Sequence, residues 1–203
     1  EGMQAYRPIG AFSFLGRYRV IDFPISNMSN SGIDRIQIYV KEKPRTLVSH
    51  IGTGRHYNIN SKSGRLQILF TDSDQRNNIY NTDIASYYEN MECIEEMHHP
   101  YVVITPDYMV YTADFSKLIE QHIQSEADIT LLYHAVDNAK DAYLNCNILN
   151  LNKQKGVLSI EPNHGNAKNR NIFMDTYIMK KDLFIELIRK AKAISSAFTL
   201  ADI

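Results

Sequence analysis

Two arginines that follow a glycine have the chemistry to contact phosphate. Arg17 and Arg19 flank a tyrosine directly after Gly16, in the run from Gly16 to Pro24. A guanidinium group can bind a phosphate through two parallel hydrogen bonds, and glycine lets a backbone approach it closely. The same run could equally form a turn and the start of a helix, with Asp22 in a local ion pair. The spacing alone leaves both interpretations open.

An aspartate, Asp107, follows a continuous apolar run from Tyr101 to Thr105. Such a run is typical of a strand that is covered on both faces. An acid at the carboxyl end of a strand is well placed to hold Mg²⁺ against the phosphates of a nucleotide. Pro106-Asp107 is also a common turn dipeptide, and composition alone favours the turn.

A polar segment from Asp74 to Thr82 leads into a predicted helix. Its side-chain amides and the N–H groups at the helix start suit an adenine edge or a phosphate, although a solvated loop with a capping Thr or Asn is the default interpretation. His98 and His99 come directly before Pro100 and indicate a helix end rather than a metal site. The sequence contains neither a Walker A loop nor a Gly-x-Gly-x-x-Gly loop.

The elements that must position these residues alternate between strand and helix. Helical stripes of apolar residues lie at 84–97, 114–123 and 183–188. Predicted strands lie at 35–40, 66–70, 101–105, 128–136, 146–149, 157–160 and 176–179. The polar segment 163–170 is predicted to be a mobile surface loop. This order predicts an α/β domain with a mainly parallel central sheet that binds ligands at the carboxyl ends of its strands.

Composition excludes several classes of protein. The chain has 203 residues, of which 44% are hydrophobic and 22% charged, as in a globular rather than a disordered protein. The formal net charge is −1 with no basic stripe, which argues against a nucleic-acid partner. No apolar run approaches the ~20 residues that span a bilayer, so we expect no membrane association. Cys93 and Cys146 are far apart in the sequence, as expected of reduced thiols in a cytoplasmic protein.

The segment from Arg7 to Ile33 resembles the glucose-1-phosphate adenylyltransferases. It reads Phe-Leu-Gly-Arg-Tyr-Arg-Val-Ile-Asp-Phe-Pro-Ile-Ser-Asn from Phe14, and Asn-Ser-Gly-Ile from Asn30. The family has Phe-Gly-Gly-Lys-[Phe/Tyr]-Arg-Ile-Ile-Asp-Phe-x-Leu-Ser-Asn and Asn-Ser-Gly-Ile. Further matches follow in the family's order, through Ser49-His50-Ile51 and the segment 101–107 to the last residues, 198–203.

The resemblance implies a Rossmann-like nucleotidyltransferase domain with a mixed sheet over residues 1–203. It also implies a left-handed β-helix domain that would lie past Ile203, and a glycine-rich strand and loop that would precede Glu1. The expected activity makes ADP-glucose and diphosphate from ATP and glucose 1-phosphate with Mg²⁺. The expected site residues are Arg17 and Asp107 for catalysis, Asp107 for the metal, Gln75, Tyr80 and Thr82 for the nucleotide, and Glu161 for the sugar phosphate.

The sequence departs from the family at several of these places. The family's glycine-rich triphosphate loop does not occur, and its Glu-Lys-Pro becomes Glu161-Pro162 without the lysine. Gly-Asp-His becomes Pro106-Asp107-Tyr108, and Ser-Met-Gly becomes Phe173-Met174-Asp175, which brings bulk and charge into the sugar pocket. The stretch before Gly16-Arg17 is two residues longer than in the catalytic subunits.

This longer form resembles the regulatory paralogue of Gram-positive bacteria, often called the GlgD type. The resemblance therefore implies a degenerate regulatory subunit in glycogen biosynthesis. It would pair with a catalytic subunit in a hetero-oligomer, with a tetramer as the expected form, or associate with itself. Two alternatives are a catalytically active enzyme and a nucleotide-sugar-binding protein without catalysis. The run 16–33 argues against a pyrophosphorylase for another base or sugar.

Overall fold

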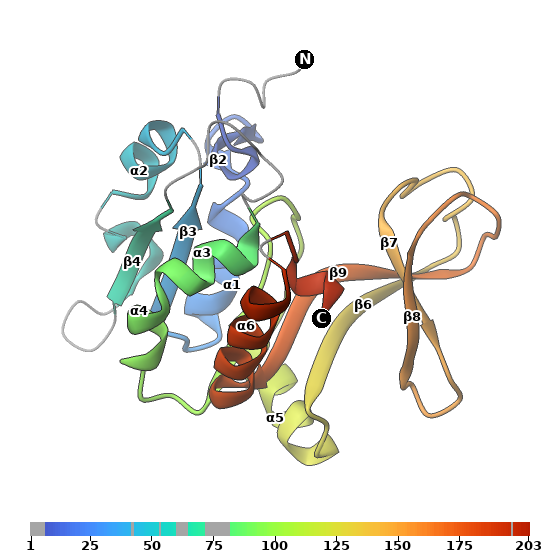
Figure 1. The fold of residues 1–203 in the computed structure, drawn as a ribbon. Coiled ribbons are helices and arrows are strands. Elements are labelled where there is room, and N and C mark those ends of the chain that lie inside the picture. Colours follow the sequence, from blue (N-terminus) through green and yellow to red (C-terminus); the bar gives the residue numbers. More distant parts are fainter. Residues whose placement is uncertain (1–6, 42, 53, 60–64, 72–81, 196) are drawn as a thin grey trace.

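The computed structural model describes residues 7–41, 43–52, 54–59, 65–71, 82–195 and 197–203. Figure 1 shows two parts: a body with helices on its sheets, and an arm that projects from it. The arm consists of residues 133–173, which form the outer halves of two long strands and a hairpin between them.

The N-terminal half of the body is built on two parallel strands, β3 (Arg35–Val40) and β4 (Arg65–Phe70), which pair in register over their whole length. Alternation along β3 buries Ile36, Ile38 and Val40, as expected of a strand with one covered face. These side chains pack against α1 (Asp22–Asn30) and α2 (Arg45–Ile51) in one core cluster.

The second sheet is organised by β9 (Arg170–Lys180), which pairs antiparallel with three other strands. These are β5 (Tyr101–Ile104), β6 (Ile129–Val136) and β7 (Asn147–Leu151), and β7 also pairs with β8 (Val157–Pro162). The body end of this sheet is covered by α3 (Asp83–Glu89), α4 (Met91–Glu95) and α6 (Lys181–Ile194). Phe184, Ile188 and Ala191 form the buried stripe of α6.

Shorter elements connect these layers. They are η2 (Ile9–Ala11), β1 (Ser13–Phe14), β2 (Tyr18–Arg19), η3 (Arg55–Tyr57), α5 (Phe115–Ser125) and η5 (Leu200–Asp202). Among the described residues, no helix is long and apolar enough to cross a membrane. The described part of the chain also contains no β-helix.

The predicted α/β architecture with a mixed sheet is confirmed, but its proportions differ from the prediction. Among the described strands the parallel pair is β3 with β4, and every pair in the sheet around β9 is antiparallel, so "mainly parallel" is wrong for this part. The strand predicted at 176–179 is the inner end of β9, which begins at Arg170.

Two local predictions also need correction. The helix predicted at 84–97 is divided into α3 and α4 at Asn90, whose side chain donates to the carbonyls of Ser86 and Phe70. The predicted surface loop at 163–170 is wrong at both ends. Asn163 is buried, and Arg170 already belongs to β9.

Candidate functional site

The predicted acid Asp107 lies directly beyond the carboxyl end of β5, where the sequence predicted it. Its Oδ2 accepts the backbone N–H of Gly10 at 3.1 Å, which joins segments 97 residues apart. A β-carbon on Gly10 would lie 2.5 Å from this oxygen, so the contact requires a glycine there. The aspartate therefore fixes the N-terminal segment to the end of β5.

Burial dominates the electrostatics around Asp107. It raises the pKa of this carboxyl above its usual value, against the opposing effects of the N–H groups of Gly10 and of Asp107 itself and of the charge on Lys41. Lys41 follows β3 and is half-buried; burial lowers its pKa, against the charges of Asp83 and Asp107. A lysine and two aspartates from three distant segments thus interact at this end of the body.

The start of α3 uses its polar side chains for structure. Thr82, predicted to bind nucleotide, is buried and accepts the N–H of Ala85 as the helix N-cap. Asp83 accepts the N–H of Ile84 and, through both carboxylate oxygens, the N–H of Leu200 at 3.1 and 3.2 Å. Asp83 therefore fixes the last described segment to α3, much as Asp107 fixes the first one to β5.

Asp175 stands at a bulge in β9. Leu132 pairs with Thr176 and Tyr133 with Phe173, which leaves Met174 and Asp175 without partners on β6. The backbone of Asp175 is left-handed, with φ of 44°, a conformation that favours glycine. Burial, and next the charge of Asp83, raise the pKa of its carboxyl. An acid therefore occupies a position whose backbone is that of a glycine.

Two other predicted site residues, Arg17 and Glu161, make no hydrogen bond or ion pair with Asp107 in the described part of the chain. Arg17 is exposed in the turn between β1 and β2. Glu161 is exposed on β8 in the arm and accepts a hydrogen bond from the amide of Asn150. Gln75 and Tyr80 lie outside the described residues.

The described donors do not fit a resident Mg²⁺ ion. No group of three or more His, Cys, Asp or Glu side chains able to hold a metal occurs among them. Asp107 supplies one carboxylate, whose Oδ2 already accepts an N–H and which the charge of Lys41 already stabilises. Mg²⁺ binds in near-octahedral geometry to hard oxygen ligands, and a lysine charge beside a carboxylate opposes that binding.

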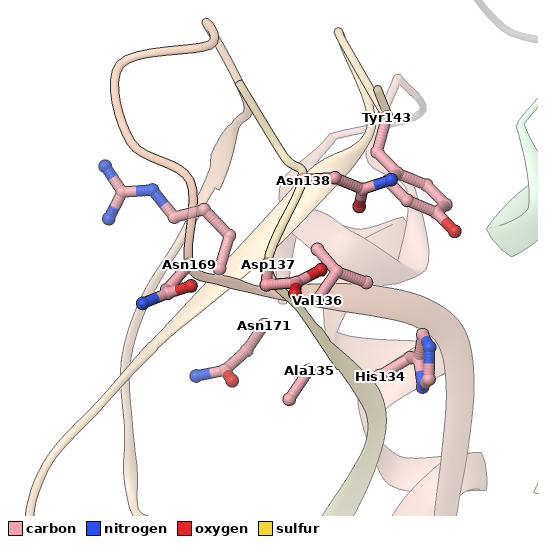
Figure 2. A pocket seen from close by; sticks show the side chains of 9 residues that line it. His134, Ala135, Val136, Asp137, Asn138, Tyr143, Asn169 and Asn171 are labelled. Atoms are coloured by element: carbon pink, nitrogen blue, oxygen red, sulfur yellow. The ribbon is translucent and has the colours of Figure 1, made fainter. Parts of the chain in front are cut away.

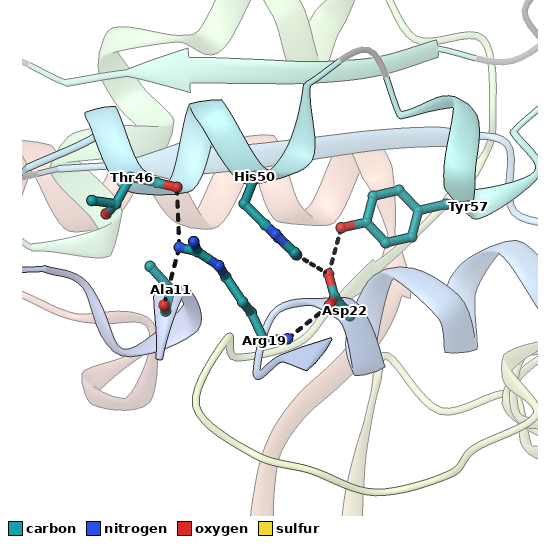
Figure 3. A network of polar contacts seen from close by, with 6 residues as sticks. All are labelled: Ala11, Arg19, Asp22, Thr46, His50 and Tyr57. Atoms are coloured by element: carbon teal, nitrogen blue, oxygen red, sulfur yellow. Dashed lines mark hydrogen bonds and ion pairs between the residues drawn. The ribbon is translucent and has the colours of Figure 1, made fainter. Parts of the chain in front are cut away.

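Asp22 lies at the centre of a hydrogen-bond network, whereas the sequence analysis considered it only for a local ion pair. Its Oδ1 accepts from Tyr57 at 2.6 Å and contacts His50 Nε2 at 2.7 Å, and its Oδ2 accepts the N–H of Arg19 at 2.8 Å (Figure 3). Burial alone would raise the pKa of Asp22, but these bonds outweigh it and the pKa lies below its usual value. The network joins α1, α2 and η3.

Arg19 completes this network, and the Nη1 of its guanidinium is committed to backbone carbonyls. It donates to the carbonyls of Ala11 and Thr46, both at 3.2 Å (Figure 3). Of the two arginines in the opening run, only Arg17 extends into solvent. The signal for the network was present in the sequence as polar residues at 22, 50 and 57, but no spacing rule connects them.

Comparisons with known proteins agree with this fold and with the resemblance. The family model described as nucleotidyl transferase matches residues 5–194. A glucose-1-phosphate adenylyltransferase of Clostridioides difficile strain 630 is 28% identical over 183 residues, or 90% of this chain and 47% of that protein. One of Clostridium perfringens strain SM101 is 32% identical over 169 residues, or 83% and 43%. The chain thus spans about half the length of these curated relatives.

A solved structure is also similar to this chain. The crystal structure of HddC from Yersinia pseudotuberculosis superimposes with a TM-score of 0.67, over 97% of this chain and 75% of that chain. The two sequences are 14% identical, so the likeness is one of fold alone.

Proposed function

Because the chain belongs to the nucleotidyl transferase family, we propose that it is part of a degenerate regulatory subunit of glucose-1-phosphate adenylyltransferase. It would pair with a catalytic subunit, in an expected heterotetramer, and change the rate or effector response of that subunit in glycogen biosynthesis. The catalysed reaction converts ATP and glucose 1-phosphate to ADP-glucose and diphosphate. The names of the curated relatives support this choice of substrates.

The single observation that carries the proposal is the state of Asp107. Its carboxylate holds Gly10 and lies in the field of Lys41, whereas a catalytic acid would need to be available to a metal ion and substrate phosphates. Asp175 supports the same conclusion, because a half-buried carboxylate on β9 would repel a sugar phosphate. Each lost electrostatic contact at a reacting phosphate costs on the order of 10²–10³ in rate.

The test is an assay of ADP-glucose formation with Mg²⁺ on this chain alone, on a catalytic subunit from the same source, and on their mixture. We expect turnover of this chain alone to be at least ~10⁴-fold below that of the catalytic subunit, since two or more such contacts are lost. We expect the mixture to differ from the catalytic subunit in rate or in response to effectors.

An Asp107→Asn variant separates this proposal from an active enzyme. Asparagine still accepts the N–H of Gly10, so a regulatory subunit should modulate its partner as before. An enzyme that uses Asp107 would lose its own turnover. Turnover of the unmodified chain near that of the catalytic subunit would contradict the proposal, and so would a mixture that behaves as the catalytic subunit alone.

A further inference from the structure

A hollow of about 610 Å³ opens in the arm, where β6 ends and β9 begins. Ala135 pairs with Asn171 and Val136 with Arg170, so the two paired strands contribute one wall. The volume lies within the ~300–1,000 Å³ typical of small-molecule sites. No residue of the predicted substrate site lines this hollow, which we call the arm pocket.

The loop that contributes Asn138 and Tyr143 to the arm pocket is held in place by a buried side chain. Asn163 is 1% exposed, and its Nδ2 donates to the carbonyls of Ala139, Ala142 and Tyr143. Its backbone N–H donates to the carbonyl of Cys146. Because one buried amide fixes this loop at several points, the pocket does not need to be ordered by a ligand, which favours binding.

The side chains that line the arm pocket retain most of their hydrogen-bonding capacity. In the described part of the chain, no side-chain hydrogen bond or ion pair is made by the lining residues His134, Asp137, Asn138, Tyr143, Asn169 and Arg170. In Figure 2, Asp137 lies between Asn169 on one side and Asn138 with Tyr143 on the other. The Nε of Arg170 is buried and has no partner, and a buried donor of this kind requires an explanation.

The charges of the lining select the class of ligand. One carboxylate, Asp137, and one guanidinium, Arg170, cancel formally, and Asp137 would repel a phosphate or a carboxylate. The amides of Asn138 and Asn169 offer both donors and acceptors, and Asn171, whose Nδ2 donates to the carbonyl of Leu149, adds an acceptor. A hydroxyl group also donates and accepts, so several hydroxyls on one ligand would match this lining. The half-exposed ring of Tyr143 adds an apolar face for a sugar ring.

We propose that the arm pocket binds a neutral carbohydrate of one or two hexose units. Asp137 and the asparagines bind its hydroxyls, and Arg170 donates to a hydroxyl or ring oxygen. The pocket is separate from the group around Asp107, so it would act as a second sugar site whether or not the chain regulates a partner.

The experiment is a calorimetric titration of the chain with maltose, and separately with inorganic phosphate. We expect saturable maltose binding in the millimolar range and no phosphate binding. Asp137→Ala and Asn169→Ala should each weaken maltose binding at least about tenfold, because each removes hydrogen bonds to the ligand. Both side chains are exposed and make no bond in the described chain, so these variants should fold normally, which circular dichroism checks.

Matched controls are Asp141→Ala and Asn166→Ala, which remove exposed side chains of the same types that do not line the pocket. Both should bind maltose as the unmodified chain does. The proposal is overturned if maltose does not bind, if phosphate binds in its place, or if maltose binding survives both pocket substitutions.

Discussion

Asp22 and Asp107 are both acids that connect segments far apart in the sequence, yet their surroundings are opposite. Asp22 is 8% exposed and is bonded to three groups, the N–H of Arg19, the hydroxyl of Tyr57 and the ring of His50. Asp107 accepts one N–H from a distant segment, that of Gly10. The pKa of Asp22 is lowered, whereas that of Asp107 is raised by burial.

This difference separates an acid that is bonded into the fold on several sides from the acid that the sequence analysis predicted as a site residue. The bonds to Asp22 repay the cost of removing its charge from water, so the charged form stabilises the fold. At Asp107 the effect of burial, which raises the pKa, is larger than the opposing effects of the Gly10 N–H and the Lys41 charge. A buried carboxyl with a raised pKa is typical of functional sites. In this chain, however, the described donors do not fit Mg²⁺.

The largest expected effect comes from removing the structural acid. Asp22→Ala should lower the free energy of unfolding by about 3 kcal/mol, because it leaves buried donors without an acceptor. Urea denaturation measures this change. Tyr57→Phe removes one of the bonds and should cost about 1 kcal/mol. Asp141→Ala, at an exposed position, should stay within about 0.5 kcal/mol of the unmodified chain. If Asp22→Ala lowers the free energy of unfolding no more than Asp141→Ala does, then Asp22 is not a structural acid.

The next effect tests the contact of Gly10 with Asp107. Gly10→Ala should cost about 2 kcal/mol in the same experiment, because its β-carbon would lie 2.5 Å from Asp107 Oδ2. In an Asp107→Ala background the carboxylate is gone and the nearest contact relaxes to 3.2 Å, at Cβ. The cost of Gly10→Ala should then fall by about 1 kcal/mol or more. Additive costs would mean that the two residues are not in contact.

The third prediction concerns acid. The pKa of Asp22 is lowered in the folded state, so its stabilisation is complete above the unfolded pKa of about 3.9 and is lost as pH falls through the folded value. The free energy of unfolding should therefore fall below about pH 4, by at most about 1.4 kcal/mol per pH unit from this group. Asp22→Asn lacks the titrating carboxyl, so the difference in the free energy of unfolding between this variant and the unmodified chain should become smaller at acid pH. A constant difference would contradict the lowered pKa.

Local patterns in the sequence predicted much of the fold. Alternation of β-branched residues located β3 to the residue, because a strand with one covered face repeats every second position. The break between α3 and α4 was not predictable, because it depends on a bond from Asn90 to the carbonyl of Phe70, 20 residues away. The outer half of β9 was missed because the bulge at Met174 and Asp175 interrupts its pattern.

The site was predictable only where one segment determines it. The place of Asp107 follows from a strand followed by an acid, and Thr82 was weighed as a helix cap from its position. The contact with Gly10 and the His50 partner of Asp22 join residues 97 and 28 positions apart, which no local pattern encodes. The arm pocket combines the end of one strand with the start of another, so it exists only in the fold.

The smallest expected effect is a gain in stability at Asp175, a third acid whose carboxyl is partly buried. Asp175→Gly should raise the free energy of unfolding by about 1 kcal/mol, because glycine adopts the left-handed backbone at φ of 44° without strain. The change also removes a carboxylate whose pKa is raised by burial and by Asp83. Asp175→Asn keeps the β-carbon and removes only the charge, so it divides the gain into its two parts. If Asp175→Gly destabilises the chain, then Asp175 makes a stabilising contact and belongs with Asp22 rather than with Asp107.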